Sequence, residues 1–124
     1  MSIEISNKYV LNWLGKLRDY WCTKNIDGAV SLFSRCTEYQ ESPFKKCATS
    51  FGEIQSLWSE IESQSEIVIK YTLLCVCHRT ATVSYDATFI DNGNYHHSNG
   101  VYVITFDDEG NCTIFKQWFM IDEV

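Results

Sequence analysis

The chain has 124 residues, a formal net charge of −6 and six cysteines. This length predicts one domain, residues 1–124, and not two. Apolar residues make up 45% of the chain, as in a packed globule rather than a disordered or fibrous chain. The densest basic segment is the pair Lys45-Lys46. An acidic chain without a basic stretch repels nucleic acid and anionic membranes, so neither is an expected partner.

The amino terminus, Met1-Ser2-Ile3-Glu4, lacks the basic and apolar regions of a signal peptide. The apolar runs are too short to span a bilayer. We therefore expect a soluble, cytoplasmic domain whose six cysteines are free thiols. Cys75 and Cys77 are too closely spaced for a zinc knuckle, and we expect both on the buried face of one strand.

The first half of the chain has helical patterning. Ser6 is a candidate N-cap, and a stripe at helical spacing follows it: Val10, Trp13, Leu14, Leu17 and Trp21. A short second helix, capped by Asn25 or Asp27, carries Ala29, Val30 and Phe33 inward. The segment 36–44 predicts a short edge strand that ends at Pro43. Ser50 and Glu53 form a capping box that starts a third helix.

The second half of the chain predicts long strands. Apolar residues alternate with polar ones over 67–77 and again over 81–89, which is typical of strands with one buried face. Asp91-Asn92-Gly93 predicts a turn, which we extend as a loop over residues 95–99. Further strands follow over 100–106 and 111–120. Helices followed by a meander of strands predict an α+β domain, with the helices packed on one face of an antiparallel sheet.

Three stretches give this sequence a resemblance to a known family. Residues 25–33 are similar to its second helix, residues 41–44 and 50–58 to its strand, loop and third helix, and residues 100–119 to its final hairpin. In order and spacing the chain resembles the nuclear transport factor 2-like superfamily, in its SnoaL-like and ketosteroid isomerase-like branch. The resemblance implies a cone-shaped, curved antiparallel sheet wrapped around the N-terminal helices (a cystatin-like roll), an apolar pocket at the open end, and commonly a homodimer.

The resemblance does not by itself imply a reaction, because the fold serves isomerases, dehydratases, cyclases and adaptors. The isomerase branch uses an aspartate, a tyrosine and a second acid for proton transfer beside a carbonyl. The matching positions here hold Ser42, Leu17 and Tyr102. A serine hydroxyl is not a suitable base, and only Tyr102 keeps a hydrogen-bonding role. Strand alternation points Glu41 away from the Ser42 side, so no general base is assigned.

We predict a pocket between the sheet and the first and third helices. Its predicted ligand-binding residues are Trp58, Tyr85, Tyr102, Phe115, Gln117 and Phe119. Tyr102 and Gln117 are the polar residues of this pocket wall. Tyr102 is the one candidate for stabilising an oxyanion. Such a wall suits a flat, mostly apolar molecule with one carbonyl or hydroxyl. The competing interpretation is that these aromatic rings are core residues.

The remaining candidates point to no metal and no cofactor. His96 and His97 are expected in the loop that follows the turn, with no carboxylate at ligand spacing, so we interpret them as solvated. Asp86 is expected on the outer face. Two function classes stay open: a small-molecule pocket protein with isomerase or dehydratase chemistry, and a non-catalytic interaction module. A homodimer is expected through the outer sheet face, which mixes Val68, Leu74 and Val76 with polar residues.

Overall fold

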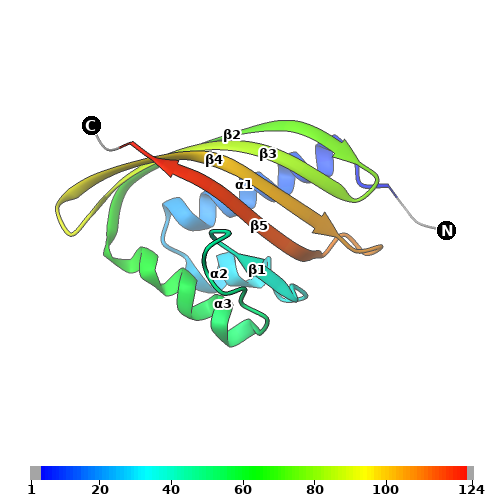
Figure 1. The fold of residues 1–124 in the computed structure, drawn as a ribbon, viewed down its shortest axis with the longest axis horizontal. Coiled ribbons are helices and arrows are strands. Elements are labelled where there is room, and N and C mark those ends of the chain that lie inside the picture. The colour runs from blue at the N-terminus through cyan, green and yellow to red at the C-terminus, as the bar shows by residue number, and fades with distance from the viewer. Residues whose placement is uncertain (1–3, 123–124) are drawn as a thin grey trace.

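The structure is a computed structural model that describes residues 4–122. Two helices, α1 (Asn7–Cys22) and α2 (Ile26–Ser31), are followed by strand β1 (Glu38–Gln40) and helix α3 (Phe51–Trp58), which continues into the 3₁₀ turn η1 (Ser59–Ser63). Four long strands complete the chain: β2 (Gln64–Cys77), β3 (Thr80–Asp91), β4 (Asn94–Phe106) and β5 (Cys112–Ile121). Figure 1 shows the helices gathered on one side of a curved, open sheet. The predicted α+β class, with helices on one face of a curved sheet, is confirmed.

The helix starts follow the predicted capping residues. The Ser6 side chain accepts a hydrogen bond from the Tyr9 backbone N–H and caps α1. Asn25, rather than Asp27, caps α2. At α3, Ser50 Oγ accepts from the backbone N–H of Glu53, whose carboxylate in turn accepts from the Ser50 hydroxyl. These caps fix where each helix enters the core.

The sheet is mixed, with the strand order β1-β5-β4-β3-β2. The four long strands are antiparallel, and β1 is an edge strand that pairs in parallel with β5. Strands β3 and β4 are joined by a two-residue turn, in which Asn92 and Gly93 both have positive φ. The predicted loop over residues 95–99 is therefore wrong, because β4 begins at Asn94 and contains His96 and His97.

Strand β2 contains a β-bulge that changes which residues face the core. Leu73 pairs with Val83, but Cys75 pairs with Thr82, so one extra residue lies between them. The alternation is inverted beyond this point. Cys75 and Cys77 are exposed, and the expectation that both are buried is wrong. Val76 instead packs against the core, so it does not belong to the outer face as predicted.

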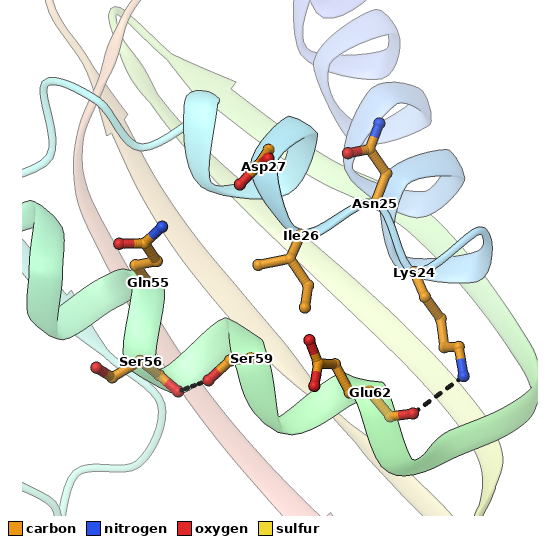
Figure 2. Close-up of a pocket in the computed structure, with 8 residues that line it drawn as sticks. All are labelled: Lys24, Asn25, Ile26, Asp27, Gln55, Ser56, Ser59 and Glu62. Atoms are coloured by element: carbon orange, nitrogen blue, oxygen red, sulfur yellow. Dashed lines mark hydrogen bonds between the residues drawn. The ribbon is translucent and has the colours of Figure 1, made fainter.

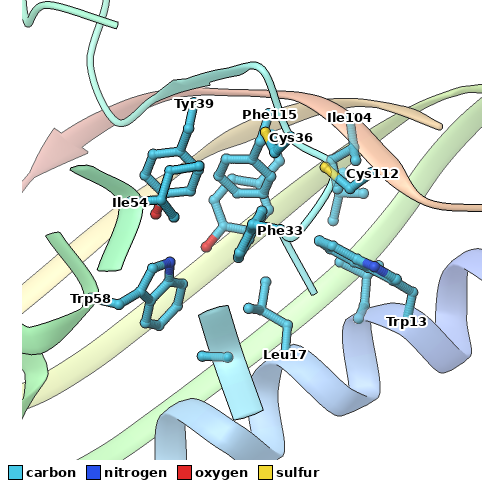
Figure 3. Close-up of a cluster of buried hydrophobic side chains, with 14 of the residues drawn as sticks. Trp13, Leu17, Phe33, Cys36, Tyr39, Ile54, Trp58, Ile104, Cys112 and Phe115 are labelled. Carbon is cyan, nitrogen blue, oxygen red and sulfur yellow. The ribbon is translucent and has the colours of Figure 1, made fainter. Parts of the chain in front are cut away.

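A single aromatic-rich core fills the space between sheet and helices (Figure 3). Trp13 makes edge-to-face contacts with Phe33 and Phe106, at 5.7 and 5.6 Å between ring centroids. Tyr39 stacks on Phe115 at 5.2 Å with an interplanar angle of 13°. This second contact anchors the edge strand β1 to β5. Within residues 4–122, each helix falls short of the length and apolarity that crossing a bilayer requires.

The homodimer remains a prediction, now with a corrected surface. The outer sheet face exposes Val68 (52%), Leu74 (56%) and Trp118 (42%), with Trp118 paired across from Val101. We expect light scattering at micromolar concentration to give twice the chain mass of 14.4 kDa. Trp118→Lys should shift the protein towards monomer because it places a charge in the contact. Leu11→Lys, which changes an exposed residue on α1, is the control. A monomeric wild type would contradict the prediction.

Candidate functional site

A cavity of about 240 Å³ lies between the sheet and the helical layer. We call it the sheet–helix cavity. Its lining includes all six residues predicted for the pocket: Trp58, Tyr85, Tyr102, Phe115, Gln117 and Phe119. Residues from α1, α3, η1 and the end of β1 complete the wall, among them Trp21, Leu57 and Glu41. The family resemblance and strand alternation thus predicted residues that line one cavity, whereas their binding of a ligand remains a prediction.

A glycine allows two strands of the sheet to approach closely beside this lining. Gly100 lies between Tyr85 and Phe119 on neighbouring strands. A Cβ atom added to Gly100 would lie 2.0 Å from the backbone oxygen of Trp118 and 2.9 Å from Cβ of Phe119. The position therefore excludes side chains.

Two of the predicted polar residues form a hydrogen bond within the lining. Gln117 Nε2 donates to the Tyr85 hydroxyl at 2.5 Å. Tyr102 stacks on Tyr85 at 4.5 Å, and its ring is 3% exposed. Burial raises the pKa of Tyr102 well above its usual value, and the neighbouring tyrosines Tyr71 and Tyr85 raise it further. Tyr102 is therefore a neutral hydroxyl that can donate a hydrogen bond.

The sequence interpretation of Glu41 was wrong. Glu41 lines the cavity, and its Oε2 atom accepts a hydrogen bond of 2.9 Å from the Tyr39 hydroxyl. Tyr39 is 1% exposed and lies on β1, two residues earlier. Residues i and i+2 share a face of a strand. Glu41 therefore shares the inward side of Tyr39, opposite to Ser42. Ser42 instead accepts a hydrogen bond from the Phe44 backbone within the turn.

The surroundings of Glu41 favour its protonated form. Burial is the largest cause that raises the pKa of Glu41, and the nearby Glu60 adds to it. The Tyr39 hydrogen bond and Lys45 act in the opposite direction. Glu41 forms no ion pair with any residue in the described part of the chain. The cavity thus contains a partly buried carboxyl group without a matched counter-charge.

The indole of Trp58 adds a second incompletely satisfied group. Its ring stacks on Phe33 at 6.1 Å and makes an edge-to-face contact with Trp21 at 5.7 Å, so its orientation is fixed. In Figure 3 the indole nitrogen points to the Tyr39 side of the cluster. Among residues 4–122, however, Trp58 Nε1 has no hydrogen bond of good geometry, and its interaction is with the Tyr39 hydroxyl. A buried N–H without a well-formed hydrogen bond is costly, and a bound oxygen atom could satisfy it.

A second concave region is a shallow polar groove between α2 and α3 with η1 (Figure 2). It has a volume of about 580 Å³ and is bordered by Asp27, Gln55 and Ser59. Lys24 reaches across one end, where its ammonium donates to the backbone oxygens of Glu62 and Gln64 at 3.0 and 3.1 Å. The lysine is thus used to tie the helical layer to the start of β2. The groove resembles solvated surface more than a binding site.

The two histidines lie on β4, outside the cavity lining. His96 stacks on Phe89 at 5.2 Å. His97 Nε2 lies 2.7 Å from Asp86 Oδ1 on the outer face, and this hydrogen bond is the main cause that raises the pKa of His97. Asp86 is on the outer face, as expected. Within residues 4–122, no three His, Cys, Asp or Glu side chains are grouped in a way that could hold a metal ion.

Solved structures establish the fold class. The chain is similar to the epoxide hydrolase/cyclase-like enzyme SalBIII, which has a role in pyran ring formation in the polyether salinomycin. The TM-score is 0.75 and the identity 15%, over 91% of this chain and 88% of the other. An LEH-like epoxide hydrolase of M. tuberculosis gives a TM-score of 0.68 and 10% identity, over 91% and 84%.

A ketosteroid isomerase-like protein of Erwinia carotovora atroseptica SCRI1043 gives a TM-score of 0.65 and 10% identity, over 94% of this chain and 93% of the other. The chain therefore shares the fold of these solved structures, which agrees with the fold that the sequence resemblance implied. No family model matches the sequence, and no curated protein matches it. At these identities the likeness shows the fold alone, and activity must be argued from the cavity.

Tyr39 should control the ionisation of Glu41. Tyr39→Phe removes the hydrogen bond that favours the carboxylate, so we expect the pKa of Glu41 to rise. Carbon-detected NMR titration of the carboxyl groups, with Glu41→Gln to assign the signal, measures this. Tyr95→Phe changes a tyrosine that is 69% exposed and is the matched control. An unchanged or lower pKa in Tyr39→Phe would contradict the described contact.

Proposed function

We propose that this chain binds a small, mostly apolar molecule in the sheet–helix cavity and that Glu41 is its main polar contact. The observation that carries the proposal is the Glu41 carboxyl group, which is held by Tyr39 inside an aromatic wall and has no ion-pair partner in the described chain. Apolar walls with a few placed polar groups are typical of small-molecule sites. Tyr102 and Gln117 would contribute the remaining polar contacts.

Proton transfer in the manner of isomerases or dehydratases is the chemistry that Glu41 would support. A carboxyl group whose pKa is raised towards neutrality is a better general base than a fully solvated one. An isomerisation would move one proton from a substrate carbon to Glu41 and then to a different carbon of the same molecule. Tyr102 or the Trp58 N–H would donate a hydrogen bond to the developing oxyanion. Similarity to an epoxide hydrolase/cyclase-like enzyme and to a ketosteroid isomerase-like protein is compatible with such chemistry.

The alternative function is a non-catalytic interaction module. For such a module we would expect the aromatic residues to fill the cavity. Trp58 and Phe115 are indeed buried, at 6% and 2% exposure. They stack on other core rings, however, and the volume of about 240 Å³ remains beside them. This free volume supports the small-molecule interpretation. A module that used only its rim would have no reason to keep a desolvated carboxyl group.

Binding can be tested with a library of monocyclic carbonyl, hydroxyl and amino compounds, in a thermal-shift screen at neutral pH. For hits, we expect Tyr102→Phe and Gln117→Leu to reduce the thermal stabilisation by the ligand. Glu41→Gln should reduce it most and raise the Kd by at least about tenfold, because a hydrogen bond to a charged group is among the stronger ones. Glu109→Gln, in the exposed turn before β5, is the control. Hits that all of these variants leave unchanged would place the binding site elsewhere.

We also propose that the protein acts in the cytoplasm, with its thiols reduced. All six cysteines are free in the structure, including the buried Cys36 and Cys112, whose side chains interact with each other. Thiol titration in denaturant, on protein prepared anaerobically without added reductant, should find six free thiols. Recovery of only four would indicate a native disulfide and an oxidising compartment.

A further inference from the structure

The cavity combines an aromatic wall with an excess of negative charge. Its charged lining residues are Glu41, Glu60 and Lys45. Lys45 is exposed and lies too far from Glu41 to form an ion pair. Its effect on the pKa of Glu41 is smaller than that of burial. Two carboxyl groups therefore face the cavity with one loosely placed cation, and Glu41 lacks the partner that buried charges normally have.

The aromatic rings supply the second observation. Tyr85 and Tyr102 are stacked on each other, Phe115 is tilted against Tyr102 at 4.8 Å, and Trp58 is fixed by Phe33 and Trp21. Ring faces attract cations through their quadrupole, and this attraction increases when the site is desolvated. Aromatic cages are one way in which proteins recognise organic ammonium groups.

Several acceptors of the lining remain available to the donors of a ligand. Gln117 uses its Nε2 atom to donate to Tyr85, which leaves the amide oxygen as its remaining acceptor. Gln64 uses its oxygen to accept from Trp21 Nε1 at 2.8 Å. Near Glu41, the Tyr39 hydroxyl is already donated to the carboxylate. At Glu41 and Gln117 the lining therefore offers acceptors to a ligand's donors, while Trp58 and Tyr102 offer donors elsewhere in the wall.

From this combination we infer that the ligand of the sheet–helix cavity carries a protonated amine, whose positive charge is paired by Glu41 and shared with Glu60. The inference rests on the proposed binding function and not on proton-transfer chemistry. It specifies the charge of the ligand, which neither the fold nor the apolar wall determines. The volume of about 240 Å³ lies below the roughly 300–1,000 Å³ of drug-sized pockets. The ligand is thus a small monocyclic or short aliphatic amine.

Three probes of nearly equal size and different charge test this inference: benzylamine, benzyl alcohol and benzoate. Affinities are measured by isothermal titration calorimetry or NMR titration at neutral pH, where an alkylammonium is charged as a lysine is. We expect benzylamine to bind at least about tenfold more tightly than benzyl alcohol, and benzoate to bind most weakly. Higher salt should weaken benzylamine binding less than expected for an exposed pair, because the site is partly buried.

Variants separate the site from a general effect of the acidic surface. In Glu41→Gln the preference for benzylamine over benzyl alcohol should be lost while benzyl alcohol still binds, and Glu60→Gln should give a smaller loss. Glu109→Gln removes an equal charge outside the cavity and should change nothing. A thermal melt of each variant confirms that it is folded. A preference that persists in Glu41→Gln would overturn the inference.

The failure of the inference is distinguishable from that of the proposed function. If benzyl alcohol or benzoate binds in the cavity as tightly as benzylamine, the inference is wrong and the binding function stands. If none of the three probes produces saturable shifts in NMR signals of Tyr85, Trp58 or Gln117, the inference is wrong and the binding function loses its support as well.

Discussion

The pairing of the short edge strand β1 with β5 is the constraint on which the cavity depends. The parallel register places Tyr39 opposite Phe115, and the two rings stack at 5.2 Å. One step beyond the last pair, Gln40 with Lys116, the same register brings Glu41 beside Gln117. The Tyr39 hydroxyl then fixes the carboxyl group of Glu41. A strand of three residues thus places the acidic group that this edge of the sheet contributes to the cavity wall.

Much of the architecture could be predicted because its signals are local. Serine and asparagine caps mark the helix starts, since each satisfies an N–H group a few residues away. The strict alternation of β3, with Ala81, Val83 and Tyr85 buried, follows from its central position between two antiparallel neighbours. The lining residues Gln117 and Phe119 follow from the same alternation on β5. Alternation therefore predicts the strand residues of the cavity wall, whereas Trp58 on α3 follows from the family resemblance.

The features that could not be predicted are those that depend on distant partners. A bulge after Leu73 reverses the faces of Cys75 and Val76, and its position depends on how β2 bends over α1. The sequence at the end of the β3–β4 hairpin predicts a loop because this part extends past the helical layer (Figure 1). Where no face of a strand is covered, apolar and polar residues need not alternate. The direction of the Glu41 side chain could be decided only from the pairing of β1 with β5. Strand β1 has three residues, and its own alternation is too short to be decisive.

The locally unfavourable features of this chain coincide at the cavity. Glu41 is largely desolvated without an ion-pair partner, and Trp58 Nε1 has no well-formed hydrogen bond among the described residues. Each of these features costs stability in a domain whose core is otherwise well packed. The raised pKa of Glu41 means that the folded state holds its proton more tightly than the unfolded chain. Glu41 therefore contributes stability at low pH, and that contribution is lost as the pH rises through the folded pKa. A ligand that pairs with Glu41 would restore it at neutral pH, so the same carboxyl group that weakens the empty protein would stabilise the complex.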